Sequence, residues 1–172
     1  MKTNPNQPKV MIIANSAFTI INFRSELIRS LIEFDSSVVA VCPEDCDLTI
    51  TRNVRDEIRT LGATFCPINF DRSGMNPFRD IILLLNLIRL IRKEQPDIVL
   101  NYTVKATIYG SIAAYLCRTR KITSNITGLG YIFTRKGFLA KFIRLIVTIQ
   151  YMVALRLNDM VFFQNSDDLS LF

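Results

Sequence analysis

Short apolar runs alternate along this chain with longer segments in which apolar residues recur every three or four positions. The short runs have the length and the β-branched and aromatic content of strands. They are Lys9–Asn15, Ser37–Pro43, Ala63–Asn69, Asp97–Thr103, Lys121–Thr127 and Asp159–Asn165. The longer segments have helical periodicity and are Phe23–Phe34, Leu48–Leu61, Pro77–Gln95, Val104–Cys117 and Phe138–Leu157. This alternation predicts an α/β fold, a Rossmann-like parallel sheet with right-handed crossovers and helices on both faces.

Two residues at predicted boundaries support this division of the chain. Pro77 stands where a helix begins, and Gly62 follows the end of another helix, which are positions that these residues favour. With 172 residues, 49% of them hydrophobic, the chain can bury one substantial core, and no repeat or linker divides it. We therefore predict one domain over residues 9–172, preceded by a flexible, proline-containing tail over residues 1–8.

The charge of the chain is concentrated in its second part. The sequence has 21 basic and 15 acidic residues, which gives a net charge of +6. Residues 1–104 carry twelve of each sign, whereas residues 105–172 carry nine basic residues and three acidic ones, so that the whole excess (9 − 3) lies there. From Lys105 to Asn158 there is no acidic residue. Such an imbalance indicates an anionic partner, which could be a phosphate group, an anionic lipid surface or a nucleic acid.

Several kinds of chemistry are disfavoured by the residue types. The chain has no histidine, which removes the usual Ser-His and Cys-His nucleophile pairs and the commonest general base. Apart from Cys42 and Cys46, its four cysteines do not have metal-ligand spacing, so we expect reduced thiols and no metal site. Neither a G-x-G-x-x-G nor a G-x-x-x-x-G-K-[ST] sequence occurs. Any chemistry must therefore depend on carboxylates, cations and backbone amides.

The residues that follow the predicted strands are the candidates for a binding site, because ligands of open parallel sheets bind outside the carboxyl ends of the strands. Polar, basic and glycine residues gather there: Asn15, Arg24, Arg72, Asn101, Tyr102, Lys105, Gly128 and Gly130. A cation at a helix start, like Lys105, opposes the helix dipole unless an anion lies beside it. The two glycines would let the backbone approach a ligand closely. We therefore predict a phosphate-binding edge, although Arg24 could be a solvated helix residue and the glycines could form a simple turn.

The sequences at this edge, taken in order, resemble one family. NSAFTIINFR, DRSGMNPFRD, NYTVKATIYG and ITGLGYIFTRKG, followed by FFQN, are similar to the glycosyltransferase 4-like N-terminal domain of bacterial GT-B enzymes. These enzymes build cell-surface glycans such as O-antigen, capsule or lipid-linked oligosaccharide. The resemblance implies an enzyme of two Rossmann-like domains that face each other across a cleft. The N-terminal domain would bind the acceptor, often a sugar on undecaprenyl diphosphate, and the C-terminal domain, absent from this chain, would bind the nucleotide sugar.

The resemblance also assigns residues and a type of chemistry. Asn15 and Arg24 match the first loop of the family, Arg72 its R-x-G-x-N-P loop, and Lys105 its lysine after the fourth strand. Gly128 and Gly130 match the glycine loop that faces the transferred sugar. By this likeness the enzyme is a retaining, metal-independent hexosyltransferase whose nucleotide sugar is a co-substrate, with no further cofactor. This half alone would be inactive.

The helix expected at Phe138–Leu157 is apolar nearly all round and begins close to several cations. We predict that Arg135, Lys136, Lys141 and Arg144 attach the protein peripherally to anionic lipid at the inner face of the cytoplasmic membrane. No apolar stretch reaches the roughly 20 residues of a membrane-spanning helix, and the N-terminus does not read as a secretion signal, so a cytoplasmic location is expected.

Two other classes of function remain open at this point. The chain could be a non-catalytic Rossmann-like module that binds a phosphorylated ligand or a protein partner, such as a separate C-terminal half. It could also bind nucleic acid, given a pI of about 9.4. Its aromatic residues lie mostly in apolar runs rather than among the basic residues, which disfavours nucleic acid as a partner.

Overall fold

The computed structural model describes residues 7–44, 53–70, 76–128, 138–165 and 169, and for 138–140 and 142 the backbone alone. Its centre is a six-stranded sheet in the order β3-β2-β1-β4-β5-β6, in which every neighbouring pair is parallel. The strands are β1 (Lys9–Ile13), β2 (Ser37–Cys42), β3 (Thr64–Pro67), β4 (Ile98–Tyr102), β5 (Lys121–Ile126) and β6 (Met160–Phe163). The predicted Rossmann-like parallel sheet is thus confirmed, with each strand somewhat shorter than the run that predicted it.

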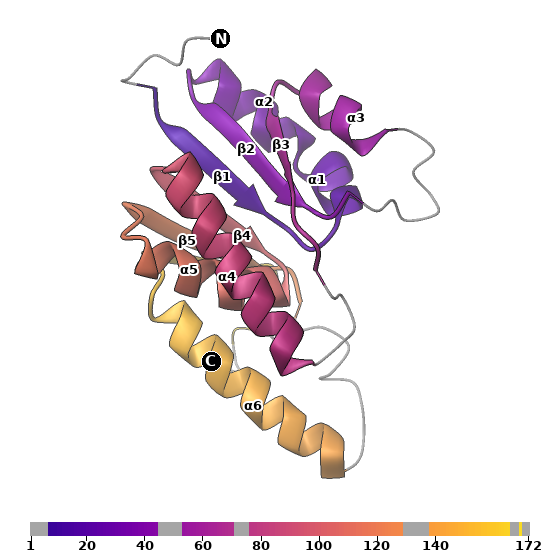
Figure 1. The fold of residues 1–172 in the computed structure, drawn as a ribbon, viewed down its shortest axis with the longest axis vertical. Coiled ribbons are helices and arrows are strands. Elements are labelled where there is room, and N and C mark those ends of the chain that lie inside the picture. Colours follow the sequence, from indigo (N-terminus) through magenta and orange to yellow (C-terminus); the bar gives the residue numbers. More distant parts are fainter. Residues whose placement is uncertain (1–6, 45–52, 71–75, 129–137, 166–168, 170–172) are drawn as a thin grey trace.

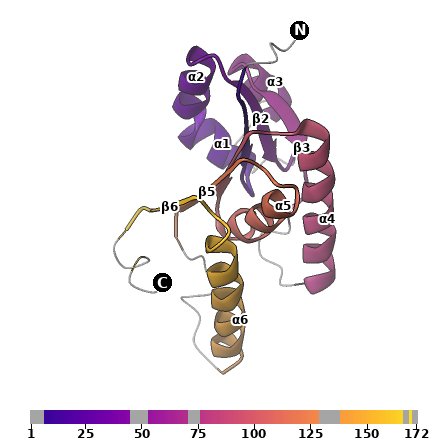
Figure 2. The ribbon, with the colours of Figure 1, turned by 90° about the vertical axis from the view of Figure 1, so that its left-hand side faces the viewer.

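Helices cover both faces of this sheet (Figure 1). One face carries α1 (Ala17–Phe23), α2 (Ser25–Glu33) and α3 (Val54–Thr60). The other face carries α4 (Pro77–Glu94), the π-helix η1 (Ala106–Gly110), α5 (Ser111–Leu116) and α6 (Phe138–Leu155). Figure 2 shows α1 and α2 on one side of the sheet and α4 and α5 on the other. The connection that contains α4 is the one that crosses from the first half of the sheet to the second.

The buried strands explain this layering. In β1, Val10 and Ile12 pack toward α1 and α2, while Met11 and Ile13 pack toward α4 and η1. All four side chains are buried. A parallel strand that is covered on both faces must be apolar at consecutive positions, and β1 and β2 have this composition.

The helix boundaries agree with the sequence at two capped ends. Asn76 accepts hydrogen bonds through Oδ1 from the backbone N–H groups of Phe78 and Arg79, and Pro77 occupies the first helical position of α4. Gly62 follows α3 with a φ of 88°, and its N–H donates to the carbonyl of Arg59.

Two helices differ from their predicted form. The segment predicted as one helix from Phe23 to Phe34 begins earlier, at Ala17, and is divided into α1 and α2 by Arg24, whose φ and ψ are −126° and 2°. The residues of α1 are rich in β-branched and aromatic types and include no acid in the first turn, so they carry little helix signal of their own. The helix predicted from Val104 to Cys117 contains the π-helical turn η1, which sequence periodicity cannot distinguish from α-helix.

A buried polar network joins β4 and β5 to the helices behind them. The amide nitrogen of Asn101 donates to the hydroxyl oxygens of Ser111 and Ser124 over 3.2 and 3.4 Å. Asn158 accepts a hydrogen bond from Ser124 and donates to Ser111, each over 2.8 Å. Gly110 lies against the Asn101 side chain with no room for a Cβ atom. Because buried polar groups are costly unless paired, this network fixes the position of η1 and α5 on the sheet.

We expect Gly110→Ala to destabilise the protein by about 1–3 kcal/mol, although alanine is normally preferred to glycine inside a helix by about 1 kcal/mol. The added Cβ would clash with Oδ1 of Asn101 and lie 2.9 Å from its Cγ. Chemical denaturation of the variant measures the effect. In an Asn101→Ala background the same change should become neutral or stabilising, and an equal loss in both backgrounds would contradict the assigned clash.

Candidate functional site

The carboxyl ends of β1 and β4 lie where the strand order of the sheet reverses. From β1 the chain proceeds outward to β2 and β3, and from β4 it proceeds in the opposite direction to β5 and β6. In open α/β sheets, ligands bind at the carboxyl ends of the strands on either side of such a reversal. The residues that follow β1 and β4 are therefore the first candidates for a binding site, and Figure 1 shows both strands ending at the same edge.

Arg24 lies beside the end of β4. It stands at the break between α1 and α2, and its guanidinium carbon lies 4.1 Å from the centre of the Tyr102 ring at the end of β4. One terminal nitrogen donates to the carbonyl of Phe23 over 2.9 Å, while Nε is buried without a hydrogen-bond partner in the described part of the chain. The structure thus brings together two of the predicted site residues, and it leaves one donor of Arg24 buried and unpaired among the described residues.

The guanidinium of Arg24 covers one face of the Tyr102 ring. Burial raises the pKa of its phenol, and the charge of Arg24 opposes part of that increase. The ring supplies an apolar, electron-rich surface on which the planar guanidinium stacks, so its role in the structure is to orient Arg24.

The backbone turns sharply after β4. Thr103 has a φ of 77°, which is unusual for a β-branched residue and costs about 1–3 kcal/mol, a strain that the surrounding contacts must offset. Its carbonyl accepts a hydrogen bond from the N–H of Thr107 over 2.9 Å, which begins the turn into η1. Strained residues and π-helical turns both concentrate at functional sites. The backbone conformation of Thr103 could not be predicted, because a left-handed threonine leaves no trace in periodicity or composition.

Lys105 has an anionic partner within the protein. Its Nζ atom lies 2.5 Å from Oδ1 of Asp80 in the first turn of α4, and the two side chains are only 15% and 14% exposed. The argument that Lys105 is unexplained without a ligand is therefore wrong, because Asp80 provides the charge that the helix start requires. A long-range pair of this kind, 25 residues apart, is invisible to a local reading of the sequence.

The same cluster contains Tyr109. Burial raises the pKa of its phenol above the usual value, and the charge of Asp80 and a hydrogen bond to Asp80 raise it further. A second hydrogen bond, with Gln150 of α6, acts in the opposite direction. Asp80, Lys105, Tyr109 and Gln150, which we call the α4–α6 polar cluster, thus connect three helices on one face of the sheet.

The other predicted residues fall into three groups. Asn101 is fully buried in the network with Ser111 and Ser124, so its side chain serves the core and does not reach the open edge. Asn15 follows β1 at the edge and is half-buried, and Gly128 follows β5 with a φ of 136° and open space where a Cβ would be. Four predicted residues lie outside the described residues. They are the site residues Arg72 and Gly130 and the membrane-contact residues Arg135 and Lys136.

These features define an open α/β domain with polar and cationic groups at the carboxyl edge of its sheet. Residues 37–165, most of the chain, match the family described as Glycosyl transferase 4-like. The chain belongs to this family, and the resemblance seen in the sequence motifs is confirmed. No protein with a curated description matches the sequence as a relative.

Solved structures share the fold at low sequence identity. A UDP-N-acetylglucosamine 2-epimerase matches with 18% identity and a TM-score of 0.61, over 94% of this chain and 43% of its own. MurG of Acinetobacter baumannii matches with 14% identity and a TM-score of 0.58, over 93% and 41%. The calicheamicin glycosyltransferase CalG4 matches with 11% identity and a TM-score of 0.58, over 92% and 48%. This chain therefore spans less than half the length of each of these proteins.

We expect Asp80→Asn to destabilise the protein by about 2–3 kcal/mol, because it leaves the nearly buried Lys105 without a counter-charge. Glu26→Gln, which removes an exposed ion pair with Arg29, should cost at most about 0.5 kcal/mol. Adding Lys105→Met to Asp80→Asn should recover much of the loss. Thermal or urea unfolding of the variants tests this, and similar small losses for Asp80→Asn and Glu26→Gln would show that the cluster contributes little.

The raised pKa of Tyr109 predicts a loss of stability in alkaline solution. The folded state retains the phenol proton, whereas an unfolded tyrosine releases it near pH ~10, so stability is complete below that pH and falls as pH rises above it. Tyr109→Phe should lower the melting temperature at neutral pH, through loss of its hydrogen bonds, but flatten the decline above about pH 10. The exposed Tyr115→Phe is the matched control, and parallel pH profiles for all three proteins would contradict the assignment.

Proposed function

We propose that this chain is the acceptor-binding half of a retaining glycosyltransferase. The complete enzyme would move a hexose from a nucleotide sugar to a lipid-linked or cell-surface glycan acceptor, in pathways such as O-antigen or capsule synthesis. The proposal is supported by membership of the glycosyl transferase 4-like family and by the likeness of the fold to two glycosyltransferases.

The observation that carries the proposal is the position of Arg24 at the reversal of strand order. Its guanidinium stacks on Tyr102 between the ends of β1 and β4, and its Nε is buried without a hydrogen-bond partner in the described chain. A planar group with parallel N–H donors fits two oxygens of a phosphate or diphosphate. Arg24 is therefore proposed to hold the diphosphate of the acceptor, with Asn15 and Gly128 lining the same edge and Arg72 and Gly130 assigned by family likeness.

A retaining transfer of this kind needs no nucleophilic side chain in this half. The positive charge of the site and the free N–H groups of helix ends would stabilise the leaving diphosphate of the nucleotide sugar. The sugar nucleotide itself would be bound mainly by a C-terminal half, and no metal or other cofactor is proposed. We place the enzyme in the cytoplasm, at the inner face of the cytoplasmic membrane, where lipid-linked acceptors and nucleotide sugars meet. No helix in the described residues is long and apolar enough to cross a membrane.

One observation favours a second candidate, a module whose main role is to bind a protein partner. Val161 and Phe163 pack toward α6, so alternation along β6 directs Met160 and Phe162 to the opposite face, where both are exposed. Parallel sheets are almost always covered on both faces. A separate C-terminal half is the partner that the glycosyltransferase family suggests.

Titration with a short-chain polyprenyl diphosphate sugar tests the acceptor proposal. We expect Arg24→Gln to weaken binding by about 1.5–3 kcal/mol, or roughly ten- to hundredfold, the range for a hydrogen bond to a charged group. Arg24→Lys should recover only part of this, because it keeps the charge without the planar fork. Arg29→Gln, on the exposed side of α2, should leave binding unchanged.

Equal affinity of wild type and Arg24→Gln, with both proteins folded, would overturn the assignment of Arg24. The wild-type chain is expected to bind this acceptor without transferring sugar from any nucleotide sugar. Measurable transfer by the chain alone would overturn the proposed division of labour between two halves.

A further inference from the structure

Polar atoms that lack hydrogen-bond partners among the described residues gather at the carboxyl ends of β4 and β5. Three of these atoms belong to three separate segments and are Nε of Arg24, Oγ1 of Thr103 and Oδ1 of Asn125. We propose that Asn125 binds a hydroxyl group of the acceptor sugar, the ring joined to the diphosphate that Arg24 holds. This inference rests on the proposed function and adds to it the residue that recognises the sugar.

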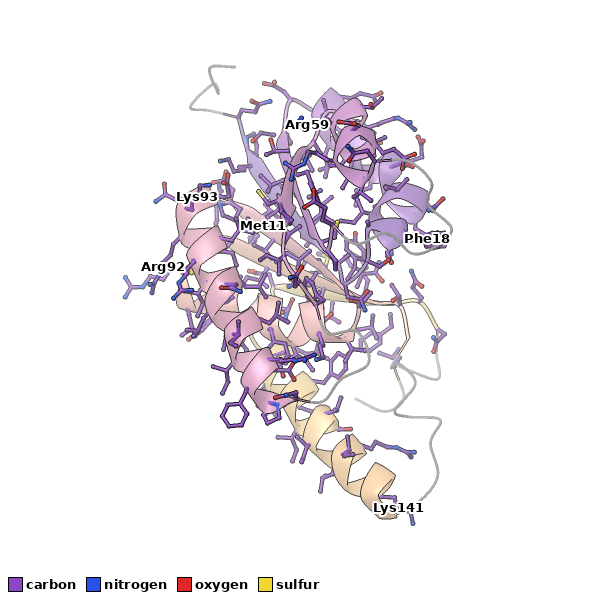
Figure 3. The ribbon with its side chains drawn as sticks, turned by 45° about the vertical axis from the view of Figure 1, so that its right-hand side comes forward. Met11, Phe18, Arg59, Arg92, Lys93 and Lys141 are labelled. Carbon is purple, nitrogen blue, oxygen red and sulfur yellow. The ribbon has the colours of Figure 1, made fainter. Side chains whose placement is uncertain are left out.

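Asn125 lies on the face of the sheet that carries α1 and α2. It stands beside Tyr102 in the register of β4 and β5, and such neighbours point to the same face of a sheet. Tyr102 belongs to the core beneath α1 and α2. The adjacent Ser124 points the other way, into the buried polar network. Figure 3 makes the two faces visible, because Phe18 of α1 and Arg92 of α4 lie on opposite sides of the molecule.

The face around Asn125 is open beside the guanidinium of Arg24. The core beneath α1, α2 and α3 contains residues of β1, β2, β3 and β4, and none of the described residues of β5 or β6 belongs to it. Asn125 is half-buried, and its neighbour in register on β6, Phe162, is 49% exposed. Neighbouring strands lie about 4.8 Å apart, so Asn125 is one strand beyond Tyr102 and the guanidinium stacked on it. One ligand can therefore contact both Arg24 and Asn125.

Two other unpaired oxygens differ from that of Asn125 in their position. Asn101 and Thr107 also have a side-chain oxygen without a partner in the described chain, but both residues are fully buried. The oxygen of Asn101 lies against Gly110, where no ligand can reach it. In the half-buried Asn125, a half turn of the amide exchanges its oxygen with its nitrogen. The side chain can thus offer either an acceptor or a donor to a group bound at the edge.

The chemistry of this position favours a sugar over the lipid part of the acceptor. The diphosphate of such an acceptor joins a sugar on one side and an isoprenoid chain on the other. An isoprenoid chain would leave the amide of Asn125 unpaired, which is unfavourable. A sugar hydroxyl can donate to Oδ1 of Asn125 and accept from Arg24 or Thr103 at the same time. The sugar is therefore directed toward β5, and the isoprenoid chain away from it.

Titration with two soluble ligands separates recognition of the sugar from recognition of the diphosphate. One ligand is a short-chain polyprenyl diphosphate that carries a hexose, and the other is the same polyprenyl diphosphate without the sugar. We expect Asn125→Leu, which keeps the approximate shape but removes the amide, to weaken binding of the sugar-bearing ligand roughly tenfold. Binding of the sugar-free ligand should stay within about twofold. Equal effects on both ligands, or no effect on either, would overturn the inference.

Thr123 provides a matched control on the same strand. It is half-buried and lies two residues before Asn125, on the same face of β5. Thr123→Val removes a hydroxyl with little change of shape and should leave the affinity for both ligands within about twofold. Asn125→Leu should melt at or above the temperature of wild type, because the lost oxygen has no partner in the described chain. A lower melting temperature together with equal weakening of both ligands would assign the amide to the fold instead.

A set of deoxy sugars on the same diphosphate identifies the hydroxyl that is recognised. We expect wild type to lose roughly tenfold in affinity for one deoxy ligand, whereas Asn125→Leu should bind that ligand and the parent sugar equally well. If wild type tolerated the loss of every hydroxyl, Asn125 would have no hydroxyl to recognise and the inference would fail.

The same titrations distinguish this inference from the proposed function. Arg24→Gln should weaken both the sugar-bearing and the sugar-free ligand, because both carry the diphosphate. If wild type bound neither ligand, the proposed function would fail and this inference with it. If Arg24→Gln weakened both ligands and Asn125→Leu weakened neither, the diphosphate site would stand and only the role of Asn125 would be rejected.

Discussion

The pairing of β1 with β4 is the constraint on which the rest of this structure depends. It joins two halves that are each built from consecutive parallel strands, and it forces the chain to cross the sheet through the long helix α4. Because connections between parallel strands are right-handed, the reversal of direction at this pair places α1, α2 and α3 on one face and η1, α5 and α6 on the other. The same reversal brings Arg24 and Tyr102 together from segments far apart in the sequence.

The strands and most helices could be predicted because their signals are local. A run such as the one in β2 is apolar at consecutive positions, and Asn76 with Pro77 marks a helix start by its own chemistry. The family could be recognised because its motifs lie at the ends of those strands. The helix α1 was missed because Thr19, Ile20 and Ile21 favour strand as much as helix.

The errors at the site have a common physical origin. Lys105 was interpreted from its position in one helix, but its charge is balanced by Asp80, which the fold brings from another. Asn101 was interpreted as a ligand contact because it ends a strand, but its side chain points into the helix layer toward Ser111. Sequence reasoning named one edge of the sheet as the candidate site. It could not decide which polar residues serve the edge and which serve the interior, because that depends on contacts between distant elements.

The two outer strands of the sheet differ in how they can accept another strand. Directly after β3, the N–H of Ile68 donates to the carbonyl of Cys42 in β2, so the nitrogen of Pro67, the last residue of β3, faces away from the sheet, where it has no hydrogen to offer. The strand is also only four residues long, and both properties protect this margin against uncontrolled aggregation. The outer margin of β6 has the sequence MVFF and no such proline. Among the described residues, the two margins of the sheet therefore differ: Pro67 hinders the addition of a further strand at β3, and no residue of this kind does so at β6.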